Sequence, residues 1–237
     1  MNTVEPAVGI DAGADAAVPG ERDAATAPIP MDDLRVGMVR GRLIFDKHNN
    51  RTNVPGVACQ LGFVGASAST LTDDTGAYVL AVPPSAQLVL RAPLGGTISV
   101  QRALENPISS PIDLHVLDID AYVGAVSRVH GNFDMFDHGA VAVRFAGSAR
   151  GGYRADLGAV HGGAFVYTSP NFANPVESTA TLAAGDSIYF YAVDPGLTTL
   201  TLTSPSGLSP CRDSAAPGAT RYEVVAGTMT EIVLSCP

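Results

Sequence analysis

Glycine and proline interrupt the apolar runs of this chain after a few residues, and this punctuation limits what the chain can fold into. The 237 residues include 25 glycines and 17 prolines, about 18% together, and no run of eighteen apolar residues occurs. That share is too high for a bundle of long helices and too low for a collagen-like or wholly disordered chain. The sequence therefore predicts a turn-rich, all-β protein without a transmembrane segment.

Short runs with a two-residue alternation predict the individual strands. The clearest strands are expected at Val39–Phe45, Val57–Val64, Ala77–Val82 and Leu88–Ala92. The best helical candidate is Thr97–Leu104, for which a loop is the alternative. Short strands at this spacing, without helical periodicity elsewhere, favour a β-sandwich.

Acidic residues are concentrated in the N-terminal tail. The formal net charge is −9, yet residues 1–33 hold seven acids and one base, so the rest of the chain carries only −3. This balance argues against nucleic acid or an anionic membrane as partner. The tail is rich in Ala, Asp and Pro and has few large apolar side chains, so we expect residues 1–35 to be a disordered linker.

The tail also resembles the spacer that follows the processed cysteine of many bacterial lipoproteins. The resemblance implies an extracellular, cell-surface or periplasmic location and a lipid anchor upstream of Met1. The alternative is the ordinary disordered N-terminus of a cytosolic protein.

Two segments recur about 110 residues apart, which indicates an internal repeat. Ala81–Pro93 lies beside Ala192–Pro205, and Gly56–Val64 lies beside Gly158–Val166. The repeat predicts two tandem β-sandwich modules, at residues 36–127 and 128–237. We place their junction within Val126–Asp137, after a last strand of the first module near Tyr122–Val126.

A turn and a strand in the first copy follow from local chemistry. Asp73 can cap a turn through its carboxylate, and Gly76 can adopt a backbone conformation that disfavours side chains. After this turn, alternation places Tyr78, Leu80 and Val82 on one buried face. Alignment of the repeat places Tyr189, Tyr191 and Val193 on the equivalent face. The two tyrosines are then either buried core or a stacking platform for a sugar.

The first copy resembles the carboxypeptidase regulatory-like modules. The resemblance lies in Gly41–Asp46, Pro55–Val57, Thr72–Leu80 and Val82–Pro84, and it covers residues 36–95 and, more loosely, 139–237. It implies transthyretin-like, seven-stranded sandwiches of the kind found as non-catalytic repeats in secreted and cell-surface proteins. Ser85 and Ala86 depart from the family pattern.

Motifs that would indicate an enzyme are incomplete. His161-Gly162-Gly163 is similar to the oxyanion-hole loop of esterases, but no Gly-x-Ser-x-Gly elbow accompanies it. The chain also lacks the terminal Tyr-Arg-Gly-Ser of hydroxyisourate hydrolases and the paired iron ligands of intradiol dioxygenases. We therefore expect no catalysis.

Histidines and aspartates cluster between the two copies. His130, Asp134, Asp137 and His138 could bind zinc or calcium. Neither a His-Glu-x-x-His helix nor an EF-hand ladder is present. The alternative is a solvated loop between the modules, and we otherwise expect no cofactor.

Three cysteines allow three single pairings, and strand order favours Cys211 with Cys236. Leu197–Thr203 leads toward Cys211, and a hairpin about Gly227 should bring Cys236 to the end of the final strand. Cys59 lies in mid-strand, where a buried thiol is common. Two free thiols in a cytosolic protein, or a terminal zinc site, are the alternatives.

These observations favour a non-catalytic structural or interaction module that binds protein or glycan through the loops at the sandwich ends. The rivals are a metal-dependent or hydrolytic enzyme at the His130–His138 loop and a carbohydrate-binding module, the second weakened by the absence of tryptophan.

Overall fold

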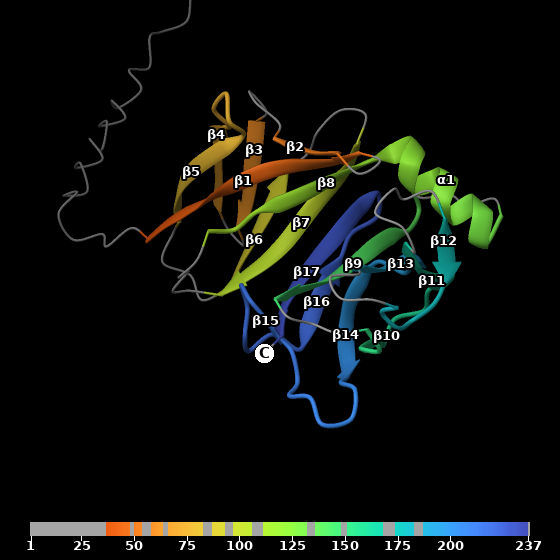
Figure 1. Ribbon diagram of the computed structural model, residues 1–237. Coiled ribbons are helices and arrows are strands. Elements are labelled where there is room, and N and C mark those ends of the chain that lie inside the picture. The colour runs from red at the N-terminus through yellow and green to blue at the C-terminus, as the bar shows by residue number, and fades with distance from the viewer. Residues whose placement is uncertain are drawn as a thin grey trace, which may run out of the picture. The chain divides into compact units, whose positions relative to one another are not determined.

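The computed structural model describes residues 37–47, 50–53, 58–63, 66–82, 87–92, 97–105, 111–131, 136–147, 151–167, 174–182 and 187–236. The acidic tail at residues 1–35, and with it the spacer prediction, lies outside them. The described residues are mostly β-strands with one α-helix, so the predicted all-β class is confirmed (Figure 1).

Two layers of strands form the first half of the chain, and pairing of Thr97 and Ile98 with Asp118 and Leu117 joins them at one edge. In one layer, β1 (Gly37–Lys47) pairs antiparallel with β5 (Ala77–Val82) and parallel with β8 (Leu114–Asp118), and β2 (Asn50–Asn53) adds to the end of β1. The other layer has the order β4 (Ala66–Leu71), β3 (Ala58–Phe63), β6 (Gln87–Ala92) and β7 (Thr97–Glu105), all antiparallel. Four of these strands lie where the alternation predicts them.

The second half repeats this pairing pattern. There β9 (Gly139–Gly147) pairs antiparallel with β13 (Ser187–Val193) and parallel with β17 (Thr228–Cys236). A three-stranded sheet has the order β10 (Arg154–Leu157), β14 (Gly196–Thr203) and β16 (Arg221–Val224). Strands β11 (Gly163–Tyr167) and β12 (Pro175–Glu177) extend the first sheet beyond β13, and β15 (Arg212–Asp213) pairs with β17.

The two halves share one sheet. Strand β7 of the first half pairs parallel with β17 of the second half, at Ser99–Gln101 and Thr228–Thr230. Residues from Val36 onward form one compact unit. The repeated pairing supports two related modules, but their separate folding stays a prediction, and the boundary that we placed at residue 127 falls inside the helix.

The helix corrects two expectations. Residues Tyr122–Val126, predicted as a strand, belong to α1 (Ile119–Val129), whereas Thr97–Leu104, the helical candidate, lies in strand β7. The Asp118 carboxylate accepts a hydrogen bond from the Ala121 amide at 3.0 Å and so caps the helix N-terminus. Tyr122, Ala125 and Val126 are buried at the three- and four-residue spacing of a helix.

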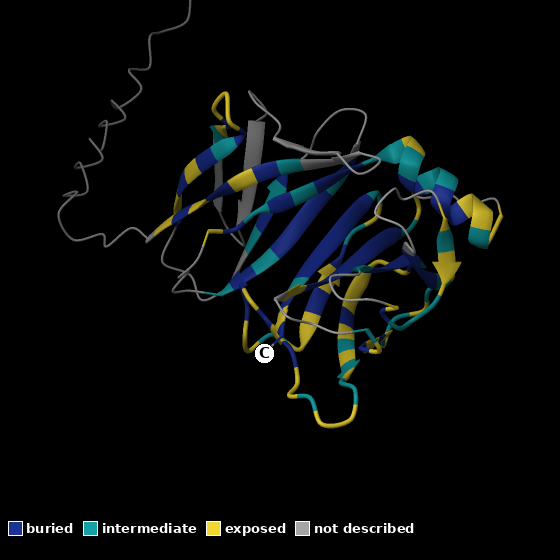
Figure 2. Ribbon diagram, in the orientation of Figure 1, coloured by how far each residue is buried: buried dark blue, intermediate teal, exposed yellow. Residues whose placement is uncertain are grey.

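Three buried clusters make up the core (Figure 2). The first lies between the β1–β5–β8 sheet and strands β6 and β7. The second lies between the β9–β13–β17 sheet and the three-stranded sheet. In the third, α1 covers the other face of β9, β11 and β13. That sheet is therefore buried on both faces, which is why β13 reads as a nearly continuous apolar run.

The predicted turn is present as expected. The Asp73 carboxylate accepts hydrogen bonds from the Thr75 amide and hydroxyl and from the Ala77 amide, at 2.7–2.9 Å. Gly76 has φ +76°, which favours glycine. The side-chain hydrogen bond from Thr75, with the Ala77 and Thr75 amides, lowers the pKa of Asp73. Tyr78, Leu80 and Val82 then fall in the first core cluster, as predicted.

Strand β13 departs from the expected alternation near its end. The repeat predicted Tyr189 and Tyr191 on the face equivalent to that of Tyr78, between two sheets, but they lie on the opposite face, against α1. Val193 lies between the sheets, in the second cluster. The register shifts between Phe190 and Val193, and Ala192 has φ +50°. This β-bulge inserts one residue and turns Val193 to the other face.

Candidate functional site

The connections at one end of the second sandwich gather into a single surface, which we call the loop end (residues 136–138, 158–162, 194–197 and 225–227). The Gly227 amide donates to the His138 carbonyl, and the Asp194 amide donates to the Val160 carbonyl, both at 2.9 Å. Nδ1 of His138 lies 3.5 Å from a carboxylate oxygen of Asp194. Strand β17 begins at this end and runs to Cys236 at the other.

Large apolar side chains are exposed on two of these connections and at the start of β14. Phe136 is 73% exposed, Val160 is 74% exposed and Leu197 is 71% exposed. The Ala159 amide donates to the buried hydroxyl of Thr198 at 3.0 Å, so the backbone beside Val160 is held in place. Exposed apolar side chains on a fixed backbone are typical of a binding surface, because little ordering entropy is lost on association.

The predicted metal ligands are only partly brought together. The His130 ring packs against Tyr191, with 5.1 Å between ring centroids, while His138 faces Asp194. Asp137 is exposed, and Asp134 lies outside the described residues. Within the described part of the chain, no three His, Cys, Asp or Glu side chains are grouped so that they could hold a metal ion. Zinc or calcium at this loop stays a prediction.

His161-Gly162-Gly163 has a packing role in the structure. The ring of Tyr191 lies where a Cβ on Gly162 or Gly163 would be, with its hydroxyl closest to Gly163. Both glycines therefore let the tyrosine pack against the backbone. Tyr191 and Tyr189 are at most 1% exposed, so the buried-core alternative is confirmed and the sugar platform that we had considered is absent.

A buried charged cluster lies where the two halves meet, away from any predicted site residue. Glu231 on β17 is 1% exposed, and one of its carboxylate oxygens lies 2.7 Å from Nδ1 of His115 on β8 and 2.5 Å from Nε of Arg144 on β9. Burial alone would raise the pKa of Glu231, but His115 and Arg144 together lower it to about 2. The cluster thus holds a carboxylate ionised between three strands.

A second polar contact crosses the same junction. The side-chain amide of Gln101 on β7 donates to the Glu223 carbonyl at 2.7 Å and to the Thr230 hydroxyl at 3.1 Å. Arg91 donates to the oxygen of the same amide at 2.7 Å. Because the side-chain nitrogen of Gln101 finds both its acceptors in the other half, the shared sheet has a defined register.

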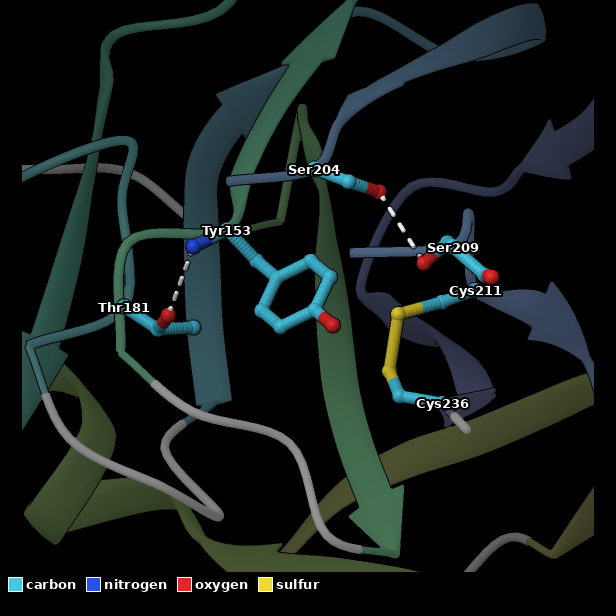
Figure 3. Close-up of a disulfide and its surroundings, with 6 residues drawn as sticks. All are labelled: Tyr153, Thr181, Ser204, Ser209, Cys211 and Cys236. Atoms are coloured by element: carbon cyan, nitrogen blue, oxygen red, sulfur yellow. Dashed lines mark hydrogen bonds between the residues drawn. A yellow bond between two sulfur atoms is a disulfide. The ribbon is translucent and has the colours of Figure 1, made fainter. Parts of the chain in front are cut away.

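The disulfide between Cys211 and Cys236 is present as predicted, with 4.3 Å between the Cα atoms (Figure 3). It belongs to the second core cluster together with Tyr153. The hairpin that we expected about Gly227 is wrong: β16 pairs with β14, while β17 pairs with β9 and β7. The strands around Gly227 therefore belong to different sheets, yet β17 still delivers Cys236 to Cys211.

Sequence reasoning missed most of the loop end and the whole charged cluster. The Asp194-Pro195-Gly196 turn was a visible signal, but nothing local places it beside His138. Glu231 was also visible as the single charge in the apolar run Met229–Leu234. Its partners come from strands 87 and 116 residues away.

Comparison by sequence finds neither a matching family model nor a matching curated protein. By structure, the chain is similar to the Bacillus anthracis TIE protein, at 10% identity and a TM-score of 0.28, over 85% of this chain and 34% of that one. It spans about a third of that protein. The shaft pilin SpaA of Lactobacillus rhamnosus GG has 10% identity, a TM-score of 0.27 and coverages of 85% and 98%.

The minor pilin GBS52 of Streptococcus agalactiae has 9% identity and a TM-score of 0.25, over 85% of this chain and 96% of that one. TM-scores this low carry no argument about this chain. The resemblance to carboxypeptidase regulatory-like modules likewise stays a prediction. Within the described residues, no helix is long and apolar enough to cross a bilayer.

Proposed function

We propose that this chain is a non-catalytic structural or interaction module, located on the cell surface, in the periplasm or outside the cell. We further propose that it binds a protein partner through the loop end. The observation that carries this proposal is the exposure of Phe136 and Val160 on two connections and of Leu197 at the start of β14. Large exposed apolar side chains on neighbouring loops are typical of protein interaction sites.

Two further observations support the proposal. The Cys211–Cys236 disulfide fits an oxidising compartment, where such bonds persist. Burial of Tyr189 and Tyr191 removes the aromatic surface that a sugar would have stacked on, and so favours a protein over a glycan.

Binding by paired variants tests the proposal. Val160→Ser with Leu197→Ser should abolish capture of a partner from a surface extract, while Val176→Ser, at another exposed apolar residue, should leave capture unchanged. Glycan arrays in parallel should show no binding. Equal capture by all three proteins would contradict the loop end as the binding site.

Metal analysis of the purified protein addresses the rival enzyme. The proposal expects less than stoichiometric zinc or calcium. One bound metal per chain, lost on replacing both His130 and His138 by alanine, would instead favour a metal-dependent activity at this loop.

A further inference from the structure

A second exposed surface lies on the outer side of strands β1 and β5. Every other side chain of these paired strands points outward: Met38 beside Ala81, Arg40 beside Val79, and Arg42 beside Ala77. Met38 is 48% exposed and Val79 is 47% exposed. We call this surface the β1–β5 face; like the loop end, it combines exposed apolar side chains with charges.

This face carries two arginines, Arg40 and Arg42, and the carboxylates of Asp73 and Asp113 both lie near Arg42. Arg40 and Arg42 are both exposed, at positions two residues apart on one strand. Arg42 lies close enough to Asp73 to contribute to the lowered pKa of that carboxyl group, so part of its charge is balanced within the chain. Arg40 stands in register with Val79, with an apolar neighbour.

The loop end carries two carboxylates, Asp137 and Asp194; Glu223 lies just beyond it on β16, where Arg221 is exposed on the same side of the strand. Asp137 follows Phe136, and Asp194 lies beside His138 with its side chain 53% exposed. Glu223 is exposed and lies directly across from Leu197 in the β14–β16 pair. Each exposed apolar side chain of the loop end is therefore near a carboxylate.

The two surfaces thus complement one another: both expose apolar side chains, and their charges have opposite signs. We propose that the partner of the loop end is a second copy of this chain, whose β1–β5 face it covers. The inference rests on the proposed function, because it uses the same loop end and names what binds there. Apolar side chains would meet apolar side chains, and carboxylates would meet Arg40 and Arg42.

Charge argues for this head-to-tail arrangement over a symmetric dimer. Two loop ends in contact would bring the carboxylates of one copy near those of the other, and two β1–β5 faces would do the same with their arginines. Like charges across an interface cost free energy, whereas opposite charges steer association. A heterologous contact leaves one surface of each kind unused, so association continues into larger assemblies or closes into a ring.

Sedimentation velocity of the full chain over a hundredfold range of concentration is the first test. The weight-average mass should rise with concentration, and association should weaken about tenfold between low salt and about 1 M salt, where the Debye length is only about 3 Å. A protein that stays monomeric over the whole range overturns the inference. The proposed function does not depend on self-association. If the protein is monomeric but Val160→Ser with Leu197→Ser still abolishes capture of a different protein, the loop end remains the binding site.

Paired variants test the arrangement itself. Arg40→Glu with Val79→Asp blocks the β1–β5 face, and Val160→Asp with Leu197→Asp blocks the loop end. Each double variant should be monomeric alone, because each lacks one of the two surfaces. Mixed in equal amounts they should form a 1:1 dimer that grows no further, because one intact surface of each kind remains.

Val176→Asp is the matched control, since it also places an aspartate at an exposed apolar position, on β12. It should associate as the wild type does.

If a double variant fails to fold, the single charge reversals Arg40→Glu and Glu223→Arg serve instead. Each should weaken association, and a mixture of the two should restore it. Folded variants that do not dimerise on mixing would overturn the head-to-tail arrangement.

Discussion

At the scale of the residue, one buried carboxylate forms an ion pair across the contact between the two halves. Glu231 contacts His115 on β8, in the first half, and Arg144 on β9, the strand paired with β17 in the second half. A buried ion pair contributes little when compared with an apolar replacement, but removal of one partner leaves the other charge buried and uncompensated. The effect of a mutation here therefore depends on which partner is lost.

Glu231→Gln should lower the free energy of unfolding by about 3–5 kcal/mol at pH 7, the usual cost of breaking a buried pair. The folded pKa of Glu231, about 2, lies below its ordinary value of 4.5. The carboxylate therefore stabilises the fold above pH 4.5, and this stabilisation is lost as the pH falls toward 2. Urea unfolding at pH 7 and at pH 3 should show a smaller difference between variant and wild type at pH 3.

Glu223→Gln is the control, because Glu223 is exposed on β16 and should change stability by less than about 0.5 kcal/mol. An unfolding free energy of Glu231→Gln equal to that of the wild type at pH 7 would show that the cluster contributes nothing.

Gly163→Ala should destabilise the protein for two reasons that can be separated. Gly163 has φ +156°, and its added Cβ would also meet the Tyr191 ring. Gly207 has φ +81° with nothing within 4 Å of its Cβ position, so Gly207→Ala measures backbone strain alone. We expect about 1 kcal/mol for Gly207→Ala and about 2–4 kcal/mol for Gly163→Ala by thermal unfolding. If both variants lost the same free energy of unfolding, the Tyr191 ring would move away from the added Cβ without cost.

At the scale of the element, α1 is the part of the fold that the repeat does not contain. It follows β8 directly, so the end of one strand and the start of the helix share Asp118. The helix buries Tyr122 and Val126 against β9, β11 and β13 and thereby completes the second half. Its formation depends on a cap and on this packing, since eleven residues alone are too few for a stable helix in water.

Asp118→Ala should cost about 1 kcal/mol of unfolding free energy, because the Ala121 amide would lose its acceptor at the helix N-terminus. Asp120→Ala is the matched control: Asp120 lies in the first turn, is exposed, and should cost only a few tenths of a kcal/mol. Chemical denaturation measures both. If Asp120→Ala lost as much free energy of unfolding as Asp118→Ala, the effect would come from the negative charge near the helix N-terminus and not from the capping hydrogen bond.

At the scale of the whole molecule, two devices hold distant segments together. Parallel pairing of β7 with β17 joins the halves, and the disulfide ties the segment around β15 to the end of β17. Asp213, within that segment, accepts hydrogen bonds from the Ala215 and Ala216 amides and from the Tyr222 hydroxyl. Burial raises the pKa of Asp213, in spite of these hydrogen bonds.

Reduction of the disulfide should destabilise the protein by about 3–4 kcal/mol on the chain-entropy model, and so lower the melting temperature by about 10 °C. Under native oxidising conditions, intact-mass analysis after alkylation in denaturant should find one modified thiol, Cys59, and reduction should raise the number to three. Three modified thiols without reductant would contradict the bond and the proposed compartment.

Cleavage between residues 131 and 138 should leave the two halves associated. His130, Gly131 and Phe136 are exposed, so limited proteolysis is expected here before the strands are cut. The fragments should co-elute on size-exclusion chromatography and separate only in denaturant, because the third core cluster contains residues from both halves. Separate elution without denaturant would show that the halves fold and stand independently.

The sequence alone determined what depends on neighbours along the chain. The Asp73–Gly76 turn, the alternation through Tyr78, Leu80 and Val82, and the strand that carries these three residues all follow from local backbone and side-chain chemistry, and all are found in the structure. The disulfide between Cys211 and Cys236 could also be predicted, because strand order places both cysteines in one half.

Tertiary structure decided what depends on residues far apart. Tyr122–Val126 is as apolar as a strand, and only the Asp118 cap and the sheet face beneath make it a helix. Ala192 shifts the alternation through a bulge that no local pattern announces. His138 meets Asp194 because β9 and β13 pair, and His115 on β8 meets Glu231 on β17 although their strands do not pair with one another. Such pairings are set by packing of the whole chain, and no short window of sequence contains that information.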